Sequence, residues 1–270
     1  MGLVDLHTHS VYSDGTLTPA ELLDRARENG VSLFSITDHD RVEGTLEGAR
    51  LAQERNLRFV PGVEVDTFCK GMDFHVLCYG ADFADEPLLE LIRDSRRRID
   101  QMSVDLLLAM RKEYPCLDLE EYEVLAHDPA LGGWKMLNYL RLKGITKDLR
   151  EGMRFYPKYG VTYADAGFFS MQEAIARMHA AGGTAILAHP GETVREGLSE
   201  ILPDLLDLGL DGVECFYPKH TPEVQGLCLE ICRRRGLMIT AGSDCHGAFG
   251  SADVGATQTE ECAISFPWRS

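Results

Sequence analysis

The sequence predicts an α/β fold: a closed or nearly closed barrel of parallel strands into which a small helical subdomain is inserted. Short apolar segments alternate with helical patterns, which is the order that a parallel sheet requires. Seven such segments favour a barrel over an open, doubly wound sheet. Between the fourth and fifth segments lie roughly 100 residues, far more than an ordinary connection needs, so an insertion is expected there.

The elements follow one another regularly along the chain. Buried strands are expected at residues 3–6, 32–36, 58–65, 74–79, 184–188, 212–216 and 237–241. Helical patterns occupy residues 19–29, 42–55, 170–181, 198–208 and 222–235. Thr18 and Glu21 have the spacing of a capping box at the start of the first helix, and Gly30, Gly182 and Gly236 stand where helices end.

The long connection contains helical patterns of its own, at residues 88–113, 119–125 and 135–142. We therefore assign residues 1–98 and 170–270 to the barrel. Residues 99–169 are expected to form the inserted helical subdomain, a candidate lid over the substrate.

Composition excludes several classes of protein. The 270 residues carry a formal net charge of −16, which disfavours a groove for long nucleic acids because such a groove needs clustered Lys and Arg. No segment is apolar enough to predict a membrane span. The N-terminal residues lack the pattern of a signal peptide, and the eight cysteines lack disulfide spacing, so a cytoplasmic protein is expected.

The first chemical motif is Asp5-Leu6-His7-Thr8-His9. Strand alternation turns His7 and His9 to the same face, about 6 to 7 Å apart, a span that one metal ion can bridge. An isolated pair of this kind arises readily by chance. Here a turn follows at once and brings the Asp14 carboxylate near the same strand end.

Further metal-binding side chains recur where the later strands begin or end. They are His39, Glu64, His75, His189, Asp244 and His246. The exits of parallel barrel strands face one rim, where active sites lie. Six of the nine histidines occupy these places, and core packing does not explain such repetition.

Imidazole and carboxylate ligands suit zinc, manganese or iron, and a carboxylate can bridge two ions. Glu64 is the candidate bridge. We expect two or three divalent ions that supply a hydroxide nucleophile and stabilise charge on a phosphoryl group. Ser10, Ser13 and Ser243 lack the nucleophile elbow of a serine hydrolase and are expected to be turn or supporting residues.

These motifs, in this order, resemble the polymerase and histidinol phosphatase (PHP) family along nearly the whole chain. The resemblance implies a distorted (βα)7 TIM-like barrel and a site for three metals. It assigns one ion to His7, His9, Glu64 and Asp244, a second to Glu64, His75 and His189, and a third to Asp14, His39 and His246.

Within the family, the chain is similar to the bacterial branch that acts on nucleoside 3′,5′-bisphosphates, nucleoside monophosphates or the 5′ ends of short RNA. That branch commonly carries an Arg in the insertion that contacts substrate phosphate. Here the stretch is Gly132-Gly133-Trp134-Lys135, so Lys135 is the candidate replacement. Arg195 and His220 are the other candidate substrate contacts, and Trp134 could stack on a base or belong to the core.

The leading hypothesis is a metal-dependent phosphatase that acts on a small phosphorylated partner, a nucleotide above all. Trimming of short 5′-phosphorylated oligonucleotides is the first alternative. Histidinol phosphatase activity is another, although the sequence resembles the histidinol phosphatases less. A non-catalytic PHP module is a further alternative, which the loss of metal ligands would indicate. None of the nine ligand positions has lost a competent side chain.

Overall fold

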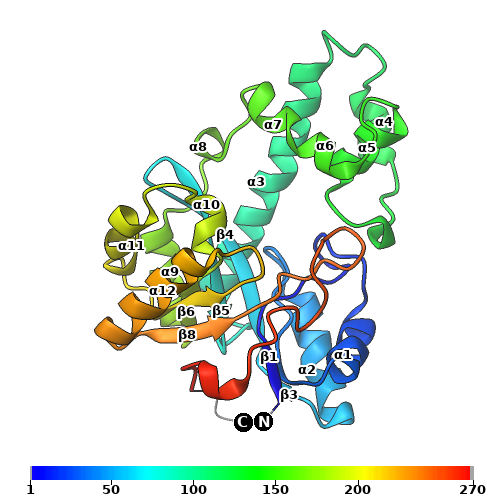
Figure 1. The fold of residues 1–270 in the computed structure, drawn as a ribbon. Helices are drawn as coiled ribbons and strands as arrows, with labels where there is room; N and C mark the ends of the chain where they lie inside the picture. Colours follow the sequence, from blue (N-terminus) through cyan, green and yellow to red (C-terminus); the bar gives the residue numbers. More distant parts are fainter. Residues whose placement is uncertain (1, 268–270) are drawn as a thin grey trace.

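The computed structural model describes residues 2–267 as strands in two sheets, with helices around them and a helical extension at one end (Figure 1). The first sheet is parallel and contains β1 (Leu3–Asp5), β2 (Val31–Phe34) and β3 (Arg58–Phe59). The second sheet has the order β4 (Gly62–Cys69), β5 (Met72–Tyr79), β6 (Thr184–Leu187), β7 (Gly212–Phe216) and β8 (Met238–Ala241).

A few hydrogen bonds connect the two sheets at both of their seams. On one side the Leu6 amide donates to the Ala241 carbonyl at 2.9 Å, and the His9 amide donates to the Cys245 carbonyl at 2.9 Å. On the other side the Glu64 amide donates to the Thr37 carbonyl at 3.2 Å. Within residues 2–267 no continuous strand ladder crosses either seam, so the structure shows an α/β fold of two linked sheets.

The expectation of seven parallel strands was wrong in two respects. Residues 58–65 divide between β3 and β4, which belong to different sheets, and β5 runs antiparallel to both β4 and β6. Strand β4 continues to Cys69, beyond its expected end, and turns into β5 through Lys70 and Gly71. Both turn residues have positive φ angles, 51° and 82°. Such a two-residue turn joins antiparallel neighbours only, whereas parallel strands need a long crossover.

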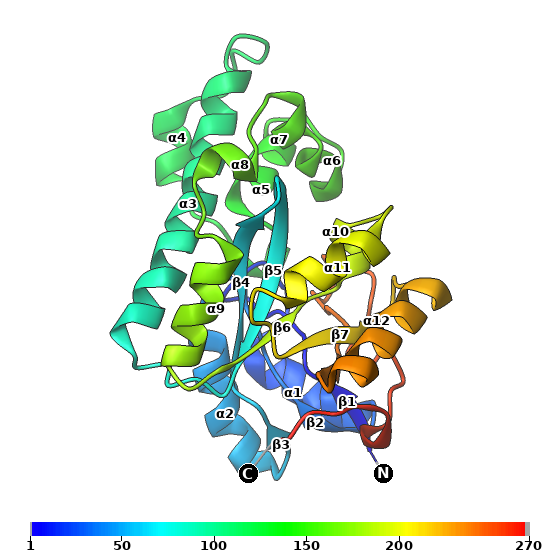
Figure 2. The same ribbon diagram turned by 90° about the vertical axis from the view of Figure 1, so that its left-hand side faces the viewer.

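The helices outside the insertion lie close to their expected positions. They are α1 (Pro19–Glu28), α2 (Glu43–Arg55), α9 (Met171–Ala180), α11 (Leu198–Leu206) and α12 (Pro222–Arg235), with the short α10 (Pro190–Thr193) and η2 (Glu261–Ala263) added. In Figure 2, α1 and α2 lie beside the first sheet and α9 lies along β4 and β5. Their buried aliphatic side chains form the main cores around the two sheets.

The insertion begins with one long helix, α3 (Glu86–Met110), which leads away from the sheets (Figures 1 and 2). The remaining elements gather towards its far end: α4 (Leu119–Val124), η1 (Pro129–Leu131), α5 (Lys135–Leu142), α6 (Leu149–Met153), α7 (Phe155–Lys158) and α8 (Tyr163–Ala166). Leu88 and Leu91 of α3 pack in the main core, whereas Leu106 and Met110 pack with Tyr139 in a separate core. The expected boundary at residues 98 and 99 therefore falls inside a continuous helix.

Among the residues that the structure describes, no helix has the length and apolar character needed to cross a membrane.

Candidate metal centre

His7 and His9 leave strand β1 on the same side and are completely buried. Their Nε2 atoms lie 3.1 Å apart. Glu64 Oε2 lies 3.0 Å from His7 Nε2 and 3.1 Å from His9 Nε2, and Asp244 Oδ1 lies 3.2 Å from His9 Nε2. Four side chains from β1, β4 and the end of β8 thus direct ligand atoms to one point, all within 4.8 Å of one another.

A second group of ligand atoms lies on the other side of His9. Asp14 Oδ2 lies 3.3 Å from His246 Nε2, and the rings of His9 and His246 stack with centroids 4.0 Å apart. His9, Asp14, His39 and His246 together place ligand atoms within 4.8 Å of one another. The turn after His9 therefore delivers its carboxylate to the site.

The third group centres on the opposite oxygen of Glu64. His75 Nδ1 and His189 Nε2 lie 3.0 and 3.1 Å from Glu64 Oε1, and His39 Nε2 lies 3.4 Å from Oε2. His75 belongs to an antiparallel strand and reaches this rim from the middle of β5 rather than from a strand exit.

The structure thus brings together all nine side chains expected at the metal site. The groups of ligand atoms differ in detail from the expected assignment of ligands to three ions, because His9 and His39 each belong to two groups. Glu64 is fully buried and contacts five imidazoles. Burial favours its neutral form, but the surrounding histidines outweigh that effect and hold the pKa of Glu64 well below its usual value.

The donor set fits divalent metal ions. Among the described residues, His9 Nδ1, Asp14 Oδ1 and His39 Nδ1 are buried atoms that have no hydrogen-bond partner. Buried polar atoms rarely remain unsatisfied, so atoms of this kind at a cluster of nitrogen and oxygen ligands indicate coordination.

Supporting residues orient these side chains, and sequence reasoning did not assign them this role. Glu214 Oε1 lies 3.0 Å from His7 Nδ1, while Glu214 Oε2 accepts the His189 backbone N–H at 3.0 Å. Asp66 Oδ1 lies 3.0 Å from His75 Nε2 and accepts the Tyr163 hydroxyl at 3.1 Å. Strand alternation puts Glu64 and Asp66 on the same face, a signal present in the sequence.

Serine residues near the first motif have the supporting role expected of them. The Asp38 carboxylate accepts hydrogen bonds from the Ser10 amide at 2.7 Å and from the Ser10 and Ser13 hydroxyls at 2.6 Å each. These contacts tie the turn after His9 to the end of β2.

The backbone at the site adopts costly conformations. Asp40, His189 and Asp244 have positive φ angles of 49°, 23° and 54°. Non-glycine residues in this region cost on the order of 1–3 kcal/mol each and concentrate at functional sites. Gly242 permits the close approach of β8 to β1, since a Cβ atom there would lie 2.2 Å from His7 Cβ.

The three expected substrate contacts lie in different environments. Arg195 lines a cavity of 420 Å³ together with His75 and His189. Lys135 donates to the Glu123 carbonyl at 3.1 Å and its ammonium lies over the Tyr122 ring, so its side chain is held within the insertion.

His220 connects two loops instead of pointing freely into the site. Its Nδ1 lies 3.2 Å from the Cys215 carbonyl, and its Nε2 accepts the Gly191 amide at 3.3 Å. Burial lowers its pKa, which favours this neutral, hydrogen-bonded ring. It therefore fixes the turn that follows His189.

A second cavity, of 560 Å³, borders Asp244 and His246. Arg150 from the insertion lines it, and Lys219 lines both cavities. Lys219 also pairs with Glu192 at 2.8 Å. Three cationic side chains thus surround the carboxylate-rich cluster in a strongly acidic chain, an arrangement suited to a small anion.

Comparison with known proteins agrees with this site. The family model described as PHP domain matches residues 5–126. The 3′,5′-nucleoside bisphosphate phosphatase of Chromobacterium violaceum is 32% identical, over 96% of this chain and 92% of its own. The phosphoribosyl 1,2-cyclic phosphate 1,2-diphosphodiesterase of Eggerthella lenta is 28% identical, over 91% and 95%. The 5′-3′ exoribonuclease of Haemophilus influenzae is 26% identical, over 93% and 92%.

A solved structure has the same fold. An amidohydrolase from Chromobacterium violaceum, with bound sulfate and no metal, superimposes with a TM-score of 0.77 at 28% identity. The match covers 93% of this chain and 89% of that protein.

Proposed function

Because this chain belongs to the PHP family of metal-dependent phosphoesterases, we propose that it releases phosphate from a small phosphomonoester, a nucleoside 3′,5′-bisphosphate or monophosphate. The observation that carries the proposal is the buried cluster around Glu64, flanked by two cavities that cationic side chains line. The cationic side chains that line these cavities favour the negative charge of a phosphoryl group at the cluster.

We assign the metal ligands as the sequence predicts. His7, His9, Glu64 and Asp244 would hold one ion; Glu64, His75 and His189 a second; Asp14, His39 and His246 a third. Manganese, zinc and iron all suit this donor set. Bound ions of this kind lower the pKa of a water and stabilise charge on phosphoryl oxygens. The chain's own contribution is to hold the ligands rigidly through Glu214, Asp66 and the loop fixed by His220.

Arg195, Arg150 and Lys219 are the side chains that we propose for contact with the substrate's anionic groups. Arg150 belongs to the insertion and lines a cavity beside the cluster, which supports the proposal that residues 99–169 form a lid. We further propose that the two sheets act as one distorted barrel beneath it. Hydrogen exchange with and without inorganic phosphate tests the lid. Slower exchange in α6–α8 is expected, and unchanged exchange there would count against it.

The eight cysteines are all free thiols. Reduced thiols of this number are usual in the cytoplasm, which is where we place the activity.

The test of the function is phosphate release by manganese-loaded protein, with a chelator-treated control. The substrates are adenosine 3′,5′-bisphosphate, AMP, histidinol phosphate and a short 5′-phosphorylated RNA. We expect chelator-sensitive release from a small nucleotide. Release of nucleotides from RNA would favour the exonuclease, and release from histidinol phosphate would favour that phosphatase activity.

Matched variants connect any turnover to the cluster. Glu64→Gln should lower turnover by at least about 100-fold, because it removes the charge that several imidazoles share. Glu261→Gln, at a partly exposed residue paired with Arg58 outside the cluster, should have no effect. Unchanged phosphate release from Asp14→Ala and His39→Ala proteins would instead support the alternative of a non-catalytic PHP module.

A further inference from the structure

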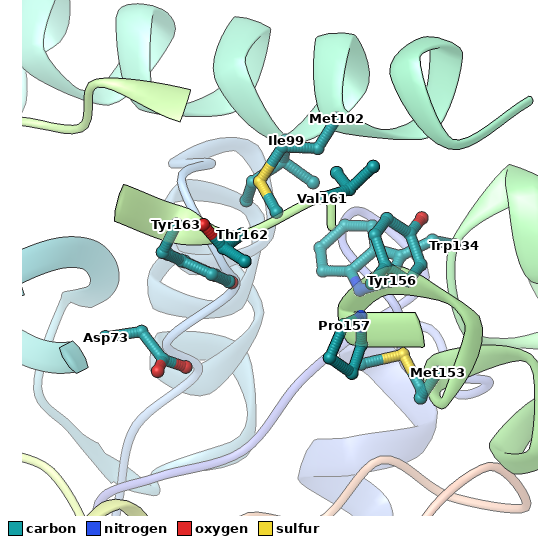
Figure 3. Close-up of a pocket in the computed structure, with 10 residues that line it drawn as sticks. All are labelled: Asp73, Ile99, Met102, Trp134, Met153, Tyr156, Pro157, Val161, Thr162 and Tyr163. Atoms are coloured by element: carbon teal, nitrogen blue, oxygen red, sulfur yellow. The ribbon is translucent and has the colours of Figure 1, made fainter. Parts of the chain in front are cut away.

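An apolar cavity of 350 Å³ lies between α3 and the segment that contains α6–α8 (Figure 3). In this view Met102 reaches in from α3, Tyr163 lies on one side with Asp73, and Trp134 and Tyr156 lie on the other. Aromatic and aliphatic side chains thus form most of its wall, and its volume is within the range of small-molecule sites.

This aromatic pocket adjoins the two cavities beside the metal centre. Asp73 lines both the pocket and the 420 Å³ cavity beside His75, and Met153 lines both the pocket and the 560 Å³ cavity beside Asp244. The Trp134 ring centroid lies 5.8 Å from that of His39. A molecule with its phosphate at the cluster can therefore extend directly into the pocket.

The aromatic rings of the pocket are held in place from behind. The Tyr163 hydroxyl donates to Asp66 at 3.1 Å, and the Tyr156 hydroxyl lies 3.0 Å from the Ser103 hydroxyl. The Arg96 guanidinium carbon lies 4.8 Å from the centroid of Trp134. Rings fixed in this way lose little conformational entropy when a planar ligand binds between them.

We propose that this pocket binds the base of a nucleotide whose phosphate lies at the Glu64 cluster. The inference rests on the proposed function and identifies the part of the site that recognises the base, because a sugar phosphate without a base leaves the pocket empty. Stacking on aromatic rings recognises the flat faces of bases, while the Asp73 carboxylate offers an acceptor for an exocyclic amino group.

Turnover ratios test the proposal. For the manganese-loaded protein, we compare kcat/KM for AMP with kcat/KM for ribose 5-phosphate. Trp134→Leu, which removes a stacking surface, and Val161→Trp, which fills the pocket, should each lower this ratio about tenfold, mainly through KM. Leu142→Ala, at a side chain on α5 that is 65% exposed, is the control and should leave the ratio unchanged. The same ratio of kcat/KM values in the unaltered protein and in both pocket variants would overturn the proposal.

Binding without catalysis provides a second readout. The chain has two tryptophans, Trp134 and Trp268, so a Trp268→Phe protein reports on Trp134 alone. Adenosine, which carries no phosphate, should quench the Trp134 fluorescence of this protein saturably. In a competition assay against AMP, the Val161→Trp/Trp268→Phe protein should bind adenosine at least about tenfold more weakly.

The two failures are distinguishable. Phosphate release without adenosine binding or nucleotide preference would refute the pocket and leave the phosphatase standing. Adenosine binding without turnover of any phosphomonoester would refute the phosphatase and leave the pocket standing.

Discussion

At the scale of single residues, the centre depends on a few buried carboxylates that are each shared by several imidazoles. Glu64 contacts five histidines, and Glu214 connects His7 to the backbone of His189. Such sharing makes the side chains interdependent, so a change at a supporting residue should alter metal binding even though that residue is not itself a proposed ligand.

Glu214→Gln tests this expectation. Glu214 accepts hydrogen bonds from two donors, the His7 ring and the His189 amide, whereas glutamine offers one oxygen and turns an NH2 group towards the other donor. We expect metal affinity to fall roughly 10- to 100-fold, measured by competition with a metal indicator. Glu261→Gln is the control. Unchanged affinity in the Glu214 variant would show that the contact does not orient the ligands.

Protonation of the cluster predicts a pH dependence. In the metal-free protein, burial disfavours charged His246, but Asp14 and Asp244 outweigh this and raise its pKa to about 10. A metal requires the neutral imidazole, so binding must release protons at pH 7 and must strengthen as the pH rises. Calorimetry in buffers of different ionisation enthalpy measures the proton count. No release would contradict the prediction.

The same raised pKa has the opposite effect on folding. A group whose pKa is higher in the folded than in the unfolded protein stabilises the fold fully below pH 6.5, the ordinary value, and loses that effect as the pH rises through about 10. Urea unfolding of metal-free protein should therefore show stability declining from pH 7 to 10. His246→Asn should flatten the decline, while His179→Asn, at an exposed position, should not.

At the scale of elements, local rules in the sequence predicted the helices well and the strand directions less well. The capping box, helix-ending glycines and periodicity placed α1, α9 and α12 within two residues. The antiparallel direction of β5 was not predicted, because its turn, Lys70-Gly71, lacks the usual Asn-Gly or Asp-Gly signal. The direction of β5 follows from this local turn, which the pattern of short apolar segments does not reveal.

The site shows the same division. Seven of its nine expected ligands follow the ends of strands, whereas Glu64 and His75 lie within β4 and β5. Residue type and spacing identified all nine as candidates. Asp66 and Glu214 act through contacts with residues far along the chain, and Lys135 turned towards Tyr122 because its helix packs within the insertion. Sequence motifs identify the residues that can bind metal, whereas the partners of each side chain are known only from the tertiary structure.

The capping box of α1 provides a prediction at the scale of elements. The Glu21 amide donates to Thr18 Oγ1 at 3.3 Å, and the Thr18 amide donates to Glu21 Oε2 at 2.8 Å. Thr18→Ala should lower the free energy of unfolding by about 1 kcal/mol, measured by urea denaturation. Glu21→Gln keeps an acceptor oxygen and should cost less. An equal loss in Glu21→Gln would indicate that the charge of Glu21, and not only its acceptor oxygen, stabilises the start of the helix.

At the scale of the whole molecule, the expected ligands connect segments that lie far apart in the sequence. They extend from His7 after β1 to His246 after β8, and they include residues from both sheets. Among the described residues, a few hydrogen bonds and isolated bridges cross the seams between the sheets, but no continuous strand ladder does. A metal ion held from both sides of a seam would therefore link the two halves of the fold.

Metal binding should accordingly stabilise the folded chain against heat. A ligand at 100 times its Kd adds about 2.7 kcal/mol when it binds the folded state alone, which corresponds to a rise in Tm of roughly 5–10 °C for a chain of this size. Differential scanning calorimetry of manganese-loaded and chelator-treated protein measures the difference. Glu64→Gln should abolish most of the rise, because its carboxylate contacts ligands from both sheets, whereas Leu142→Ala should retain it. A rise of equal size in the Glu64 variant would place the stabilising metal elsewhere in the molecule.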